Sequence, residues 1–205
     1  MDALVETDLE QAIADTRRWL ERAVIGLNLC PFAKAVHVKG QIHYAVTAAR
    51  GGADLLDVLE AELQALAAAD PAVRDTTLVI APWAYPDFYA FNDFLDDADR
   101  LLARLGLEGV LQIAPFHPRF QFAGTDADDI TNATNRAPYP TLHLIREASI
   151  DRAVEAFPDA EAIYQVNIDT LEQLGPQGWA ALDVGPRLPP ARPDAGPSAC
   201  GKLGP

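Results

Sequence analysis

The spacing of apolar residues divides the chain into segments with the period of a helix and short apolar runs typical of strands. Apolar or small residues recur at steps of three and four in the first segment. They are Leu9, Ile13, Thr16, Leu20, Ala23 and Leu27. Because Pro31 disfavours helical geometry in the residue before it, this first helix is expected to end near residues 28–30. Residues 55–66 and 88–105 show the same period and predict two further helices.

Three short runs rich in apolar residues predict strands at residues 42–46, 76–80 and 109–114. The second and third runs are continuously apolar, which is typical of parallel strands that are covered on both faces. Strands that alternate with helices indicate an α/β domain. We therefore expect a three-stranded, or slightly larger, mainly parallel sheet layered with helices. Additional C-terminal helices are predicted over residues 141–157 and 160–174.

A polar segment without any period follows the third predicted strand. It covers residues 115–140, and about 25 residues is longer than a passive connection usually is. In α/β sheets, ligands usually bind outside the carboxyl ends of the strands. Since this segment begins at such an end, with the sequence Phe116-His117-Pro118, we expect the functional site there.

The composition of the chain changes near residue 185. Residues 185–205 contain six prolines and four glycines, so this stretch has too little apolar material to order itself and is expected to be a disordered tail. Cys200 lies in the tail and is assigned no role. Residues 1–184 are expected to form a single α/β domain.

Charge and cysteine content limit the partners and the compartment. Sixteen Lys and Arg against thirty Asp and Glu give a net charge of −14, so we expect no nucleic-acid partner and no membrane partner. No apolar run approaches the roughly 20 residues of a membrane span. The N-terminus lacks the basic and apolar regions of an export signal. Two cysteines do not form a disulfide framework, so we expect a cytoplasmic protein. The sequence does not indicate an oligomeric state.

Cys30, in the sequence Leu29-Cys30-Pro31-Phe32, is the first candidate catalytic residue. If Cys30 caps a short helix over residues 32–36, free backbone amides would stabilise the reactive thiolate. If it instead ends the first long helix, carbonyl oxygens would surround the sulfur and disfavour the thiolate. A lone cysteine is also commonly a buried, inert apolar residue. The sequence leaves these alternatives open.

His117 and His143 are the candidate bases or metal ligands. A neutral imidazole suits either task near pH 7. Cys30 together with the two imidazoles would suit zinc, iron or copper, and an open fourth position would make such a metal site catalytic. Against this, the chain has no short metal-ligand spacing such as His-Glu-x-x-His. The alternative for each histidine is a structural role, in the loop for His117 and on a solvated helix face for His143.

Four basic residues are candidates for binding an anionic substrate. They are Lys34, Arg119, Arg136 and Arg146. Guanidinium groups bind carboxylates and phosphates through paired hydrogen bonds, so a pocket formed by these residues would favour such ligands. The alternative is that the arginines pair with aspartates of the same polar segment.

Six short segments in combination resemble one protein family. They are VIGLNLCPFA (24–33), NDFL (92–95), GVLQ (109–112), FHP (116–118), QFAG (121–124) and NRAPYPTLHL (135–144). Together they are similar to the bacterial family catalogued as domain of unknown function fourteen-fifteen, over residues 19–179. The resemblance implies no particular activity. It does imply that Cys30, His117, Arg136 and His143 belong to the characteristic motifs of that family.

These observations predict an enzyme that acts on a small anionic molecule, with a reaction that the sequence does not name. Cys30 and His117 are its expected catalytic residues. Its expected substrate-binding residues are Lys34, Arg136, His143 and Arg146. One alternative is a metal-dependent enzyme in which Cys30, His117 and His143 bind zinc, iron or copper.

Two further alternatives remain. The sequence Cys-Pro-Phe-Ala at residues 30–33 also resembles the monothiol motif of glutaredoxin-like proteins, which implies a redox protein that uses Cys30 alone. In that fold, however, the cysteine follows a strand, whereas here it follows a segment with helical period. The last alternative is a binding module without catalytic activity.

Overall fold

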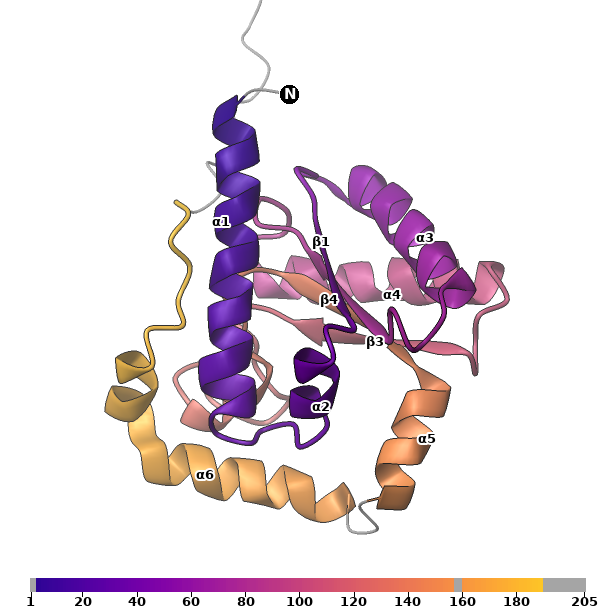
Figure 1. The fold of residues 1–205 in the computed structure, drawn as a ribbon. Coiled ribbons are helices and arrows are strands. Elements are labelled where there is room, and N and C mark those ends of the chain that lie inside the picture. Colours follow the sequence, from indigo (N-terminus) through magenta and orange to yellow (C-terminus); the bar gives the residue numbers. More distant parts are fainter. Residues whose placement is uncertain (1–2, 157–159, 190–205) are drawn as a thin grey trace, which may run out of the picture.

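The computed structural model describes residues 3–156 and 160–189 of the chain. A four-stranded sheet lies at its centre, with the strand order β1-β2-β4-β3 (Figure 1). Its strands are β1 (Ile42–Val46), β2 (Thr76–Ile80), β3 (Leu111–Phe116) and β4 (Thr141–Arg146). β1 and β2 are parallel, while β4 is antiparallel to both β2 and β3. The α/β class is confirmed, but the sheet is mixed and mostly antiparallel, so the prediction of a mainly parallel sheet is wrong.

The strand β4 accounts for this difference. The sequence predicts a helix over residues 141–157, but residues 141–146 form β4 and only α5 (Glu147–Ala156) is helical. Leu142 and Leu144 are buried on one face of the sheet, and Ile145 lines a cavity on the other. Residues 141–144 do alternate polar and apolar, but the alternation lasts only four residues and breaks at Ile145, so it is too short to mark a strand by itself.

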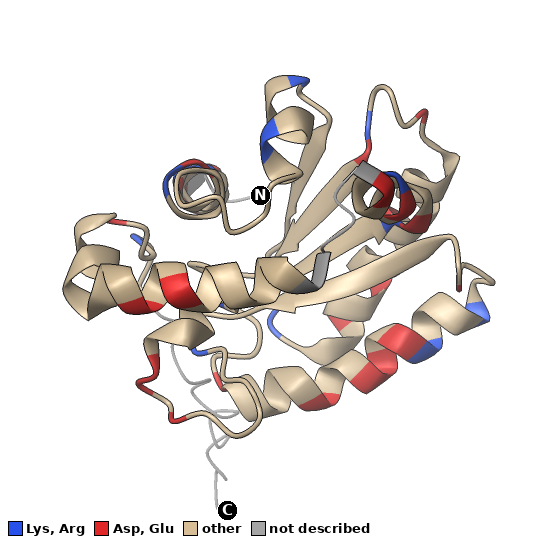
Figure 2. Ribbon diagram, turned by 90° about the horizontal axis from the view of Figure 1, so that it is seen from below, with Lys and Arg blue, Asp and Glu red and all other residues tan. Residues whose placement is uncertain are grey.

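Helices cover both faces of the sheet. One face packs against α3 (Gly52–Ala68) and α4 (Phe88–Arg104), whose buried leucines and phenylalanines form the larger core. The other face packs against α1 (Ala3–Trp19), which continues into the π-helix η1 (Leu20–Ile25). The short helix α2 (Ala33–Val38) follows η1. The helices and loops carry nearly all of the charged residues, and the strands carry few (Figure 2).

Several predicted boundaries are confirmed and others shift. The first two strands lie at the predicted residues, whereas β3 begins and ends two residues later than predicted. The long polar segment is irregular apart from the 3-10 helix η2 (Ile130–Asn135). The final helix α6 (Ala160–Ala181) passes residue 174 but is interrupted at Gly175, whose φ of 66° lies in the left-handed region.

The segment after α6 packs along α1. Arg18 donates hydrogen bonds to the carbonyl oxygens of Asp183 and Gly185, and Leu188 is buried. Order therefore continues past residue 184, into the first residues of the predicted tail. The rest of that tail, from residue 190 and including Cys200, lies outside the described residues. No helix among the described residues has the length and apolar character needed to cross a membrane.

Candidate active site

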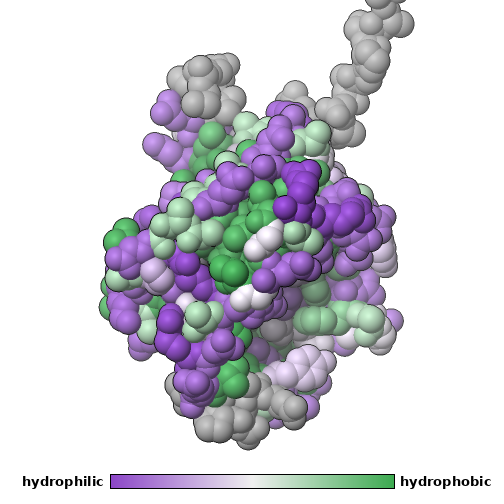
Figure 3. All heavy atoms as spheres, turned by 90° about the vertical axis from the view of Figure 1, so that its right-hand side faces the viewer, coloured by the Kyte–Doolittle hydropathy of each residue, from purple (hydrophilic) through white to green (hydrophobic). Residues whose placement is uncertain are grey.

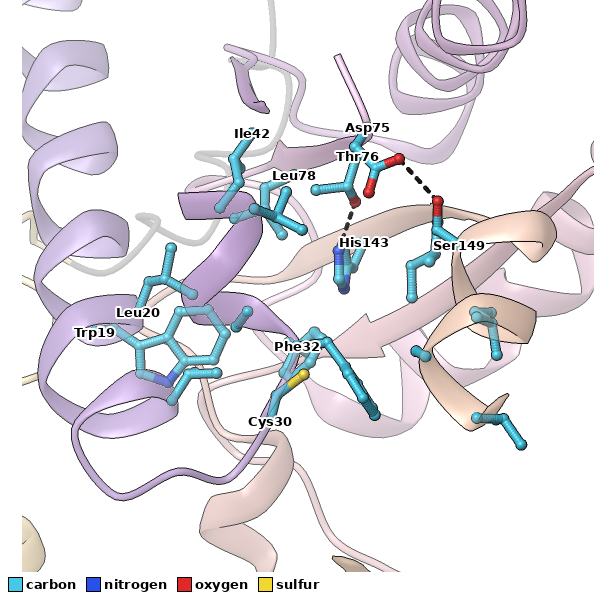
Figure 4. Close-up of a pocket in the computed structure, with 18 residues that line it drawn as sticks. Trp19, Leu20, Cys30, Phe32, Ile42, Asp75, Thr76, Leu78, His143 and Ser149 are labelled. Carbon is cyan, nitrogen blue, oxygen red and sulfur yellow. Dashed lines mark hydrogen bonds between the residues drawn. The ribbon is translucent and has the colours of Figure 1, made fainter. Parts of the chain in front are cut away.

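A cavity of about 250 Å³ lies between the sheet and the helices on its α1 side, with α2 and α5 at its edges (Figure 4). Its walls are almost entirely apolar. They include Trp19, Leu20, Phe32, Phe116, Ile150 and Val154. Viewed from the right-hand side of Figure 1, hydrophobic side chains gather in the middle of a mostly hydrophilic face (Figure 3). A cavity with this lining fits a small molecule with a large apolar part.

Five residues with polar side chains also line the cavity, and they come from distant parts of the chain. They are Cys30, Asp75, Thr76, His143 and Ser149. Asp75 and Thr76 lie at the start of β2, His143 lies on the neighbouring strand β4, and Ser149 lies on α5. Cys30 is in the turn between η1 and α2. Pairing of β2 with β4 is what brings Thr76 beside His143.

The hydrogen bonds of Thr76 fix the tautomer of His143. The Thr76 hydroxyl lies 2.6 Å from the carbonyl oxygen of Leu144 and 2.7 Å from Nε2 of His143. A hydroxyl has one proton, and a carbonyl oxygen only accepts, so Thr76 donates to Leu144. Nε2 of His143 must therefore carry the proton and donate to Thr76. This leaves Nδ1 as an unprotonated acceptor that bonds to no described residue.

Burial keeps His143 neutral. Desolvation in this apolar environment lowers the pKa of His143 from 6.5 to about 4, because the charged ring is poorly solvated there. At neutral pH the ring is therefore an uncharged base with a free Nδ1. A neutral imidazole in this state can accept a proton from a nearby group.

Cys30 faces the same cavity as His143 (Figure 4). It is half-buried, and its sulfur makes no hydrogen bond to a described residue. It does not cap α2, because the N-cap position belongs to Phe32 and the Cys30 carbonyl accepts the Ala33 amide. The sequence-based possibility of a thiolate held by free helix amides is therefore wrong. The sulfur instead faces the cavity that His143 also lines.

His117 lies on the opposite face of the sheet from Cys30 and His143. Its ring packs against Phe88 and Phe91 of α4, whereas the preceding Phe116 packs against Trp19 on the α1 side. Both ring nitrogens are used: Nε2 donates to the Tyr85 carbonyl, and Nδ1 accepts the Arg119 amide. Burial lowers the pKa of His117, so it too is neutral at pH 7. His117 is almost completely buried.

The expected convergence of Cys30, His117 and His143 therefore does not occur. The side chains of residues 116 and 117 point to opposite faces of the sheet because successive residues of an extended chain alternate. Among residues 3–156 and 160–189, no group of three or more His, Cys, Asp or Glu side chains could hold a metal ion. The three residues proposed as zinc, iron or copper ligands do not form such a site.

The four basic residues proposed for anion binding do not form one pocket, and no Lys or Arg of the described part of the chain lines the cavity of Cys30 and His143. Lys34 is exposed on α2. Arg146 is buried and donates to the carbonyls of Leu66 and Ala69 at the end of α3, which is a structural role.

Arg119 and Arg136 do share a second, more polar cavity of about 390 Å³ on the α4 side. Both guanidinium groups already have partners there. Arg119 pairs with Asp87 at 3.3 Å, and Arg136 donates to the carbonyls of Phe120 and Ala127. The alternative in which these arginines serve local contacts is the one that the hydrogen bonds support.

Sequence reasoning missed Asp75, Thr76 and Ser149. Thr76 stands in a predicted strand, but nothing in a single sequence pairs it with residue 143. The prediction of a helix over residues 141–157 also hid the strand that carries His143. The one signal in the sequence was the position of Asp75, a charged residue directly before the apolar run that forms β2.

Comparison with known proteins supports the family resemblance described above. The sequence model of the family described as protein of unknown function (DUF1415) matches residues 11–181. No curated protein and no solved structure matches the chain.

Proposed function

The chain belongs to the DUF1415 family, and we propose that it is an enzyme that binds a small, mainly apolar molecule in the cavity on the α1 side. In this proposal Cys30 and His143 act on the bound molecule. The observation that carries it is the free Nδ1 of a neutral imidazole and a thiol facing one apolar cavity. Apolar walls would hold the molecule, and the two side chains would supply the chemistry.

The division of roles follows from the hydrogen bonds. His143 Nδ1 is the proton acceptor, because Nε2 is committed to Thr76. Cys30 is the nucleophile, since a thiol that loses its proton to a nearby base becomes the reactive thiolate. The apolar lining offers water few hydrogen-bonding partners beside these two groups, and a low-polarity site strengthens electrostatic interactions within it.

This proposal differs from the sequence-based one in two respects. His143 replaces His117 as the partner of Cys30, because His117 lies across the sheet and both of its nitrogens are bonded. The ligand is mainly apolar rather than anionic, because no cationic side chain of residues 3–156 and 160–189 lines the cavity. The glutaredoxin-like alternative is not proposed, since the helical η1 rather than a strand precedes Cys30.

The rate of Cys30 alkylation by iodoacetamide at neutral pH tests the pair. All variants are made in a Cys200→Ser background, so that Cys30 is the remaining thiol. His143→Gln is expected to slow alkylation about tenfold or more, because the base is lost. Ala153→Trp is expected to slow it as well, since Ala153 lines the cavity that gives access to the sulfur.

The matched control is His37→Gln. His37 lies on α2, near Glu21 on the surface, and does not line the cavity. This variant should react at the wild-type rate. Equal rates for wild type and His143→Gln, with folding unchanged, would refute the assignment of His143 as the base for Cys30.

A further inference from the structure

The hydrogen-bonding groups around the cavity are nearly all acceptors. Nδ1 of His143 carries no proton, and the Thr76 hydroxyl proton is committed to Leu144. The Ser149 hydroxyl donates to Asp75 at 2.8 Å. Among the described lining residues, the donors left are the weak thiol of Cys30 and the indole N–H of Trp19, which Figure 4 shows at the other end of the cavity from Asp75. A ligand can therefore satisfy the acceptors at the Asp75 end only by bringing donors of its own.

Asp75 adds negative charge to the same end of the cavity. Its Oδ1 accepts the Ser149 hydroxyl, and Arg152 approaches that same oxygen at 3.7 Å. Its Oδ2 has no hydrogen-bond partner among the described residues. Figure 4 shows Asp75 beside Thr76, above the ring of His143. Asp75 thus has one unused carboxylate oxygen near the ring of His143, at the polar end of an otherwise apolar cavity.

No Lys or Arg among the described residues lines the cavity to balance these acceptors. Arg152 is the cation near Asp75, but its side chain is 63% exposed and it does not line the cavity. Because Arg152 does not line the cavity, an anionic group placed there would meet the carboxylate of Asp75 with no cation beside it among the described lining residues, and burying an unpaired charge is costly. A protonated amine would instead pair with the carboxylate of Asp75.

We infer that the ligand of this cavity is a small apolar amine, and this inference rests on the proposed function of the cavity. The ammonium group would lie at Asp75 and donate to its unused carboxylate oxygen, which leaves Nδ1 of His143 free to act on Cys30. The hydrocarbon part would lie among the apolar side chains, including Leu20, Phe32 and Val154. The charge of the whole chain, −14, favours the approach of such a cation.

Three small molecules that share a six-carbon hydrocarbon part but differ in their headgroup test this inference. Hexylamine, hexan-1-ol and hexanoate are titrated into the full-length protein near neutral pH, and calorimetry gives each dissociation constant. Hexylamine should bind at least about tenfold more tightly than hexan-1-ol, through the ion pair with Asp75, and hexanoate should bind most weakly. Asp75→Asn should reduce hexylamine affinity about tenfold and leave hexan-1-ol affinity unchanged.

Asp151→Asn is the matched control. Like Asp75→Asn, it removes one negative charge, but Asp151 is exposed on α5 and does not line the cavity. Hexylamine affinity should therefore stay at the wild-type value. Hexanoate or hexan-1-ol binding as tightly as hexylamine to wild-type protein would overturn the amine inference but leave the cavity as a binding site. Failure of all three probes to bind would overturn both the inference and the proposed function. The wild-type comparison decides the matter even if Asp75→Asn does not fold.

Discussion

His143 makes the stability of this protein sensitive to acid. Its pKa is about 4 in the folded protein, against an ordinary value of 6.5. Between these two pH values the unfolded chain binds a proton that the folded protein does not bind. The free energy of unfolding therefore falls as the pH falls from 6.5 towards 4. One pKa unit corresponds to about 1.4 kcal/mol, so the whole interval corresponds to about 3 kcal/mol.

Urea unfolding of wild type and His143→Gln at two pH values measures this effect. Going from about pH 7.5 to about pH 5 crosses about 1.5 units of the interval, which predicts a loss of about 2 kcal/mol from this ring. The variant has no ring to protonate, so its loss should be smaller by that amount. His43 and His117 also have pKa values lowered by burial, but both remain in the variant and cancel in the comparison.

Val154→Ala is the control for this measurement. Val154 lines the same cavity without a titratable group, so its replacement should lower stability equally at both pH values. If wild type and His143→Gln lose the same free energy between the two pH values, within about 0.5 kcal/mol, the ring is not held neutral by burial. The assignment of a free, unprotonated Nδ1 at the pH of function would then lose its basis.

Three further substitutions test the structure. Thr76→Val should lower the free energy of unfolding by about 1–2 kcal/mol and change the ¹⁵N chemical shifts of the His143 ring, because Nε2 loses its acceptor. Thr76→Ser keeps the hydroxyl and should preserve both the stability and the chemical shifts. Asp15→Asn should lower the free energy of unfolding by about 3 kcal/mol in urea, because this buried carboxylate accepts hydrogen bonds from Tyr139 and from the segment after α6. Arg146→Met should lower the free energy of unfolding by about 3 kcal/mol, since it leaves carbonyl oxygens at the end of α3 unpaired. Unchanged stability of Asp15→Asn or of Arg146→Met would contradict the role given to that residue.

The local sequence pattern predicted two kinds of element correctly. They are helices that bury only one face and elements whose ends are marked by capping or turn-forming residues. The helix over residues 88–105 has a regular apolar stripe, and it forms α4 with Asp87 as its N-cap. The strands at residues 42–46 and 76–80 are bounded by polar or turn-forming residues and lie where predicted. In these segments the apolar spacing and the end residues indicate the same structure, so one sequence was enough.

The candidate site was predicted only in part, and the reason is its dependence on long-range pairing. Cys30 and His143 were both singled out by residue type, and they line one cavity. Their common partner was expected to be His117, but side-chain alternation at the end of β3 places His117, the residue after the strand, on the α4 face. Which face a residue occupies depends on strand register, which no local pattern in this segment specified.

The sequence by itself determined the α/β class, the positions of most helices and strands, and two of the residues that face the cavity. These properties follow from the spacing of apolar residues and from residue chemistry within short segments of the sequence. Only the tertiary structure decided that residues 141–146 enter the sheet as β4 between β2 and β3. That pairing set Thr76 against His143 and thereby fixed its tautomer, because hydrogen bonds between strands depend on contacts between residues far apart in the chain.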